Sequence, residues 1–221
     1  MAAYEKVPTD LCYALQQGQL CCVAGLSPYR QHAMCSEACS EMEKRGYRSI
    51  VLQLSPLSKR LSVGVEWDKY VIKHLWHSFH PTNGVRLAQW LKATEALSPQ
   101  ERLMAFTNDL FLSDLCESPM AIFIDDMDAI ANIPFAVSDL FAWIEHCYEL
   151  RDTYLSYHHL IFAVFSGYKR PSLDAATGFP RLGLQDVKCF YPSCFYPSYR
   201  PHLCRLALST VMPSIQTVSI A

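Results

Sequence analysis

Four short runs of apolar residues, separated by stretches with helical periodicity, constrain the fold of this chain more than any other feature. The runs span residues 20–24, 50–54, 120–124 and 160–165. Nearly uninterrupted apolar residues over five or six positions are typical of strands that are buried on both faces, as strands of parallel sheets are. The pattern therefore predicts an α/β domain, a three-layer αβα sandwich with a parallel sheet.

Helical patterns precede the first run and fill the intervals between the runs. Helices are expected over residues 9–17, 32–45, 66–79 and 137–150, and Gly46 is expected to end the second of them. A further helix is expected to begin after Ser98, because Ser98-Pro99-Gln100-Glu101 forms a capping box with proline at the first helical position.

Composition excludes several classes of protein. The chain has 221 residues, of which 51% are hydrophobic, and this is enough apolar material to exclude a disordered chain. The formal net charge of −2 provides no general basic field, so no nucleic-acid partner is expected. No apolar run reaches the length of a transmembrane helix, about 18 residues. The first ten residues lack the pattern of a signal peptide, so a cytoplasmic protein is expected.

Neither the cysteines nor the histidines predict a metal site. The ten cysteines follow no zinc-binding spacing, and without a secretion signal they are expected to be reduced thiols that act as small buried hydrophobes. Three histidines recur at intervals of three positions: His74, His77 and His80. One face of a helix accounts for this spacing better than a metal site does.

Polar residues gather after the first and third apolar runs, in the segment GLSPYRQH at 25–32 and in Asp125-Asp126. Ligands of parallel α/β sheets bind beyond the carboxyl ends of the strands. A strand, a loop and a helix, followed later by an apolar strand that ends in acids, is the layout of a P-loop nucleotide triphosphatase. In such a site backbone amides and a lysine hold the phosphates, and a hydroxyl and an acid hold Mg²⁺.

The chain resembles the AAA-like (STAND-type) ATPase domain of multidomain bacterial signalling proteins, many of them from photosynthetic bacteria. The resemblance covers about residues 11–183 and rests on the colinear segments ALQQGQLCCVAG, KRGYRSIVLQL, LSPQERLMAF, MAIFIDDMDAI, SDLFAWIEHCYELR and LIFAVFSGYKRPSLDAATGFPRLG. It implies that the strand at 160–165 lies between the first and third strands and that the strand at 50–54 is outermost. It also implies an AAA-like domain over residues 1–183, followed by an extension over residues 184–221 in place of the family's helical lid and winged-helix region.

The loop departs from the pattern GxxxxGK[ST] that the resemblance requires. Gly25 is retained, but Arg30, Gln31 and His32 stand where glycine, lysine and a hydroxyl belong. A residue with a Cβ resists positive φ, glutamine lacks the lysine charge, and histidine is a poor ligand for Mg²⁺. Pro28 removes one backbone amide donor. The loop is therefore not expected to hold phosphates, and no cofactor is expected beyond weak binding of ATP with Mg²⁺.

The acidic strand end is better preserved. The resemblance places Asp125 at the metal-holding position, and Asp126 stands where a glutamate usually orients the attacking water. Two interpretations remain open, because the same two acids are equally suited to capping the following turn. Arg30 and His32 similarly form either an anion site at a helix N-terminus or two solvated loop residues, and the second is favoured.

The C-terminal part of the chain, from residue 166 onward, differs from the rest in composition. It has 6 basic and 2 acidic residues and 6 of the 13 prolines, whereas residues 1–165 have 13 basic and 19 acidic residues. Its aromatic segment is expected either to dock a partner protein or to fold back over the sheet. The candidate partner-binding residues are Phe190, Tyr191, Phe195, Tyr196, Tyr199 and Arg200.

Together these features predict a catalytically inactive AAA-like domain, a pseudo-ATPase without catalytic residues, that acts as a protein-binding, scaffold or regulatory subunit. The alternative is a nucleotide-responsive switch that still binds ATP or ADP weakly through the acidic strand end. A third interpretation, a nucleic-acid accessory that uses the basic extension, is less favoured by the net charge.

Overall fold

The computed structural model describes residues 6–56, 67–80, 84–114, 118–130, 134–167 and 187–190. The strands are β1 (Leu20–Val23), β2 (Arg48–Gln53), β3 (Met120–Asp125), β4 (Leu160–Phe165) and β5 (Val187–Phe190). The α-helices are α1 (Lys6–Gln16), α2 (Pro28–Lys44), α4 (Trp67–Phe79), α5 (Gly84–Ala93), α6 (Pro99–Phe106), α7 (Leu112–Asp114) and α8 (Pro134–Glu149). A π-helical turn (Thr107–Phe111) and three 3₁₀ turns (Met127–Ile130, Leu150–Asp152 and Leu155–His159) complete the elements. Among these described elements no helix combines the length and the apolar character needed to cross a lipid bilayer.

The five strands form one parallel sheet in the order β2-β3-β4-β1-β5. The predicted α/β fold with a parallel sheet is confirmed. The expected placement of β4 between β1 and β3, with β2 at the edge, is also confirmed. The sequence analysis did not anticipate β5, which lies at the start of the expected extension and pairs with β1.

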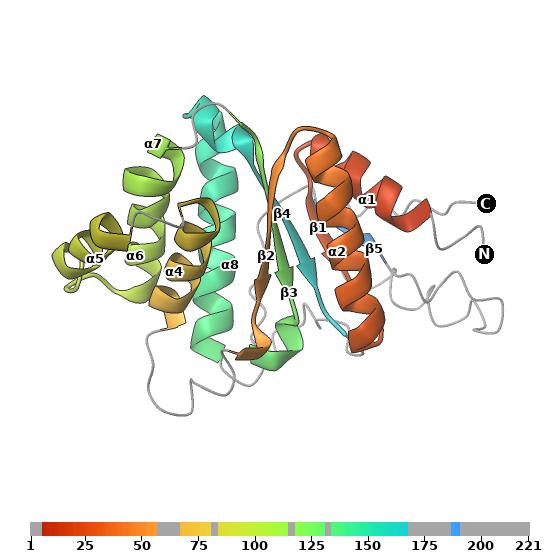
Figure 1. Cartoon of the computed structure of the whole chain (residues 1–221), viewed down its shortest axis with the longest axis horizontal. Coiled ribbons are helices and arrows are strands. Elements are labelled where there is room, and N and C mark those ends of the chain that lie inside the picture. Colours follow the sequence, from red (N-terminus) through yellow and green to blue (C-terminus); the bar gives the residue numbers. More distant parts are fainter. Residues whose placement is uncertain are drawn as a thin grey trace.

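Helices cover both faces of the sheet (Figure 1). α1 and α2 lie on one face, and α4, α6 and α8 lie on the other. Successive side chains of β3 enter the two cores in turn, since Ile122 and Ile124 pack on the α8 side and Ala121 and Phe123 pack on the α2 side. Both faces of the strand need apolar residues, which is why the sequence shows a continuous run there.

Helix α2 begins one turn earlier than the sequence analysis predicted. Ser27 has extended backbone (φ −65°, ψ 151°) and precedes Pro28, the first helical residue. The fixed φ of proline suits this position, and its missing N–H is not needed there. Residues 28–31 are therefore part of a helix, where the sequence analysis expected a loop.

A helical layer built from α4, α5 and α6 is held by a buried ion pair. Asp68 of α4 is fully buried and accepts a hydrogen bond from Arg102 of α6, which is 4% exposed. The remaining N–H groups of the guanidinium reach the carbonyls that close the turn between α5 and α6, those of Thr94, Glu95 and Leu97. Burial raises the pKa of Asp68, while the Arg102 charge acts in the opposite direction. α5 itself was not predicted; its buried residues are Leu87 and Leu91.

The described cysteines are buried or half-buried free thiols, as predicted: Cys12, Cys21, Cys35 and Cys147 are buried, and Cys22 and Cys39 are half-buried. His74 and His77 of α4, and His80 directly after it, make contacts within the helical layer and with the neighbouring strand. His74 donates to the carbonyl of Val51 on β2, His77 donates to the carbonyl of Lys73, and His80 packs against the ring of Trp76 at 4.3 Å.

Candidate functional site

The start of α2 and the ends of β1, β3 and β4 meet at the carboxyl edge of the sheet. The structure thus brings the loop after β1 next to the acids after β3, as the sequence layout predicted. Gly25 has φ +82°, and its N–H donates to the carbonyl of Gly167, which follows β4, at 2.8 Å. The positive φ explains why glycine stands at this position.

The Asp125 carboxylate is the centre of the site. Its side chain is 6% exposed, and both oxygens lie within hydrogen-bonding distance of α2 side chains. The amide Nε2 of Gln31 donates to Oδ1 at 2.8 Å, and Nδ1 of His32 lies 3.1 Å from Oδ2. Gln53 of β2 places its amide nitrogen 3.4 Å from the same ring nitrogen of His32. Gln31 and His32, two of the residues that the sequence analysis singled out, therefore contact the carboxylate directly.

The first turn of α2 is an ordinary helical turn. The N–H of Gln31 donates to the carbonyl of Ser27 at 2.8 Å, so this amide is used within the helix. Pro28 has no N–H to offer. Gln31 is 3% exposed, whereas Arg30 is exposed and His32 keeps 59% of its side chain accessible. Of Arg30, Gln31 and His32, only Gln31 is itself buried.

Asp126 combines an unusual backbone with a raised pKa. Its φ of +63° makes it the single described residue other than glycine in the left-handed region. Its carbonyl accepts a hydrogen bond from the N–H of Ala129 at 3.0 Å, which starts the 3₁₀ turn after β3. Burial raises the pKa of its carboxyl group, a hydrogen bond from Ser55 lowers it, and the charges of Asp125 and Asp128 raise it further. Asp126 therefore shapes the turn through its backbone while its carboxyl group stays near two other acids.

The structure adds residues to the site that the sequence analysis missed. Asp128 accepts a hydrogen bond from the Ser166 hydroxyl at 2.9 Å and another from the N–H of Gly167. A Cβ at Gly167 would lie 2.8 Å from Oδ2 of Asp128, so a larger residue there would require the Asp128 carboxylate to shift. Ser166 and Gly167 directly follow β4, and the rule that ligands of parallel sheets bind at the carboxyl ends of strands could have identified them.

The candidate partner-binding residues lie almost entirely outside the described part of the chain. Phe190 is the last residue of β5, and only its backbone is described. The others, Tyr191, Phe195, Tyr196, Tyr199 and Arg200, fall in the range that the structure does not describe. Their role stays a prediction. Within the described ranges no group of three or more His, Cys, Asp or Glu side chains is arranged to hold a metal ion.

Comparison with known proteins gives a distant relative and no family. No protein-family model matches the chain. An uncharacterized WD repeat-containing protein of Synechocystis sp. is 26% identical over 163 residues, which are 74% of this chain but 14% of that protein. The chain thus spans about a seventh of the relative's length. Among solved structures, a chain in the structure of Drosophila ORC bound to GC-rich DNA and Cdc6 aligns with a TM-score of 0.46 and 14% identity, over 86% of this chain and 28% of that one.

Proposed function

We propose that this chain is a catalytically inactive AAA-like domain that serves as a protein-binding, scaffold or regulatory subunit. The observation that carries the proposal is the contact of Gln31 and His32 with the two oxygens of Asp125. In a working P-loop site, the acid at this strand end faces Mg²⁺, and the loop side chains face the phosphates. Here the carboxylate is hydrogen-bonded to the chain's own side chains instead.

The residues present do not suit a magnesium–nucleotide complex. A phosphate cradle needs several backbone N–H groups that converge on the anion and a lysine that neutralises it. At these positions the chain offers Pro28, which has no N–H, and Gln31, whose backbone N–H bonds to Ser27 and whose side chain bonds to Asp125. Mg²⁺ at Asp125 would compete with Gln31 and His32 for the carboxylate oxygens, and loss of the Gln31 contact would leave a buried amide without its acceptor, which opposes binding.

Two further observations support the assignment to the AAA-like family and the protein-binding role. The strand order β2-β3-β4-β1 is the order that the family resemblance implies. The Synechocystis relative contains WD repeats in the same polypeptide as the matching segment. A domain that is joined to such repeats in one polypeptide is suited to a role in protein assembly.

The second candidate function is a nucleotide-responsive switch. The observation that favours it is the position of Asp126 and Asp128 beside Asp125 at the carboxyl ends of the strands. These acids still offer oxygen atoms of the kind that Mg²⁺ prefers.

Isothermal titration of the full chain with ATP, ADP and GTP in the presence of Mg²⁺ tests both proposals. We expect no saturable heat with any of them at micromolar protein, because the positions that would hold phosphate are engaged within the protein. A dissociation constant in the micromolar range would contradict the pseudo-ATPase and favour the switch. The Asp125→Asn variant would then show whether that nucleotide binds at the strand ends, since the substitution keeps the shape of the side chain but removes its charge.

A further inference from the structure

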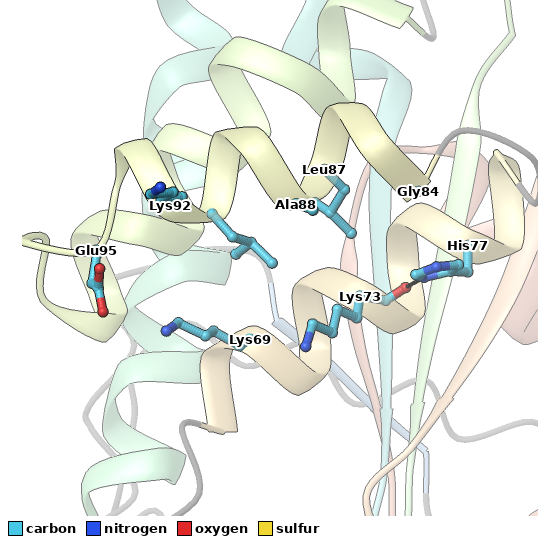
Figure 2. A pocket seen from close by; sticks show the side chains of 9 residues that line it. Lys69, Lys73, His77, Gly84, Leu87, Ala88, Lys92 and Glu95 are labelled. Atoms are coloured by element: carbon cyan, nitrogen blue, oxygen red, sulfur yellow. Dashed lines mark hydrogen bonds between the residues drawn. The ribbon is translucent and has the colours of Figure 1, made fainter.

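The groove between α4 and α5 lies away from the strand ends and belongs to no function discussed above. It is open to solvent and has a volume of about 590 Å³. Figure 2 shows Lys69, Lys73 and His77 in succession along α4, with α5 on the opposite side. Both helices are among the described residues and are fixed to the body through Asp68 and through the leucines of α5.

The two walls of the groove differ in chemistry. Lys69, Lys73 and His77 follow one another at intervals of four positions, so they form one row on α4 with a spacing of about 6 Å along the axis. The α5 wall is apolar through Leu87, Ala88 and Leu91, and it ends in Lys92, with Glu95 beyond the end of the helix. Leu87 and Leu91 are 1% and 9% exposed and form the floor, whereas Ala88 is exposed.

The charge of this surface is opposite to that of the domain around it. α4 and α5 together carry four basic residues and one acidic residue, and that acid, Asp68, is buried against Arg102. The outward charges of the two helices are Lys69, Lys73, Arg86 and Lys92. Residues 1–165 as a whole carry 13 basic and 19 acidic residues. A local basic row of this kind attracts acidic partners and repels basic ones.

We propose that the groove binds an acidic amphipathic helix of a partner protein. Glutamate or aspartate at every fourth position of a helix repeats at about 6 Å, which matches the row of Lys69, Lys73 and His77. Apolar side chains on the adjacent face of such a helix would lie against Ala88 and the leucine floor. The inference rests on the proposed protein-binding function and names the chemistry of the partner.

A nucleic acid fits the groove less well. Phosphates would meet the lysines, but Leu87, Ala88 and Leu91 of α5 offer them no side-chain donors, and Glu95 at one end repels them. The net charge of −2 also supplies no wider basic field around the groove. A helix with alternating acidic and apolar faces satisfies both walls together.

Fluorescence anisotropy with a designed peptide tests the proposal. The probe is a fluorescein-labelled amphipathic peptide with glutamate at every fourth position and leucine beside each glutamate, titrated with the full chain. Two control peptides carry lysine in place of glutamate or serine in place of leucine, and we expect both to bind at least about tenfold more weakly. We expect Lys73→Glu and Lys92→Glu each to weaken binding of the probe about five- to tenfold, because each reversal replaces an attraction by a repulsion.

Lys44→Glu is the matched control, because it changes the net charge equally at an exposed lysine on α2, on the opposite face of the sheet. We expect it to change the affinity less than about twofold. Equal effects of the three variants, or no binding of the probe, would overturn the proposal. A single-stranded oligothymidine that binds more tightly than the peptide and is released by Lys73→Glu would overturn it as well. The nucleotide titration decides the proposed function separately, because it concerns α2 and β3 rather than α4 and α5.

Discussion

At the scale of residues, the buried side chain of Asp125 shows how one carboxylate can join two elements. Its carboxylate accepts a hydrogen bond from Gln31 and contacts His32, so it joins α2 to β3 across the sheet edge. A buried amide that loses its acceptor retains the full penalty of desolvation. The carboxylate is therefore expected to contribute to stability.

Asp125→Ala is expected to lower the free energy of unfolding by about 1–3 kcal/mol, because it leaves the Gln31 amide buried without an acceptor. Asp125→Asn keeps an oxygen that can accept from Gln31, and we expect it to lower the free energy less. Urea unfolding followed by circular dichroism measures both variants. An Asp125→Ala protein that is as stable as the parent, or more stable, would argue that the acid is retained for a ligand rather than for the hydrogen bonds.

At the scale of elements, local sequence determines where some helices begin. Ser98 begins α6 with a complete capping box, as predicted: its hydroxyl accepts from the N–H of Glu101 at 3.3 Å, and its own N–H donates to the Glu101 carboxylate at 2.9 Å. The Ser98 hydroxyl also lies 2.7 Å from that carboxylate. These hydrogen bonds to Ser98 lower the pKa of Glu101 below its ordinary value of 4.5.

Ser98→Ala is expected to lower the melting temperature at neutral pH by about 2–4 °C, because α6 loses its N-cap. A carboxyl group with a lowered pKa in the folded state stabilises the fold above its ordinary pKa, and this effect is lost as the pH falls through the folded-state pKa. The difference between the parent and Ser98→Ala should therefore shrink as the pH falls below 4.5. Melting curves recorded between neutral and acidic pH test this, and a difference that grows toward acid would contradict it.

At the scale of the whole molecule, the sheet separates two hydrophobic cores, and the described cysteines contribute to both. Cys12 and Cys35 lie in the core on the α2 side, and Cys147 lies in the core on the α8 side. Burial raises the pKa of Cys12 to about 11 and raises the pKa values of Cys35 and Cys147 further. These thiols are therefore protonated at pH values where an ordinary cysteine is partly ionised.

In the native protein, iodoacetamide at pH 8 should leave Cys12, Cys35 and Cys147 unmodified under conditions that fully modify free glutathione. In denaturant all three should react, because unfolding restores both access and an ordinary pKa. Peptide mass spectrometry gives the extent of modification at each site. Rapid native labelling of Cys35 or Cys147 would mean that the corresponding core opens readily.

The sequence by itself determined the elements whose signals are local or periodic. The apolar runs gave the strands β1 to β4, because a strand between two helical layers must be apolar on both faces. Ser98 gave the start of α6. The sequence also predicted that the loop after β1 does not hold phosphates, since that conclusion needs only the identities of Arg30, Gln31 and His32.

Only the tertiary structure decided which contacts Gln31 and His32 make. Gln31 and Asp125 are 94 positions apart, and their hydrogen bond depends on β1 and β3 ending at the same sheet edge. The addition of β5 to the sheet depends on pairing with β1 across more than 160 residues, for which a short strand gives no local signal. The groove between α4 and α5 likewise exists only because two helices pack beside each other. Local periodicity indicates whether a residue is buried, but contacts between distant segments depend on how the whole chain folds.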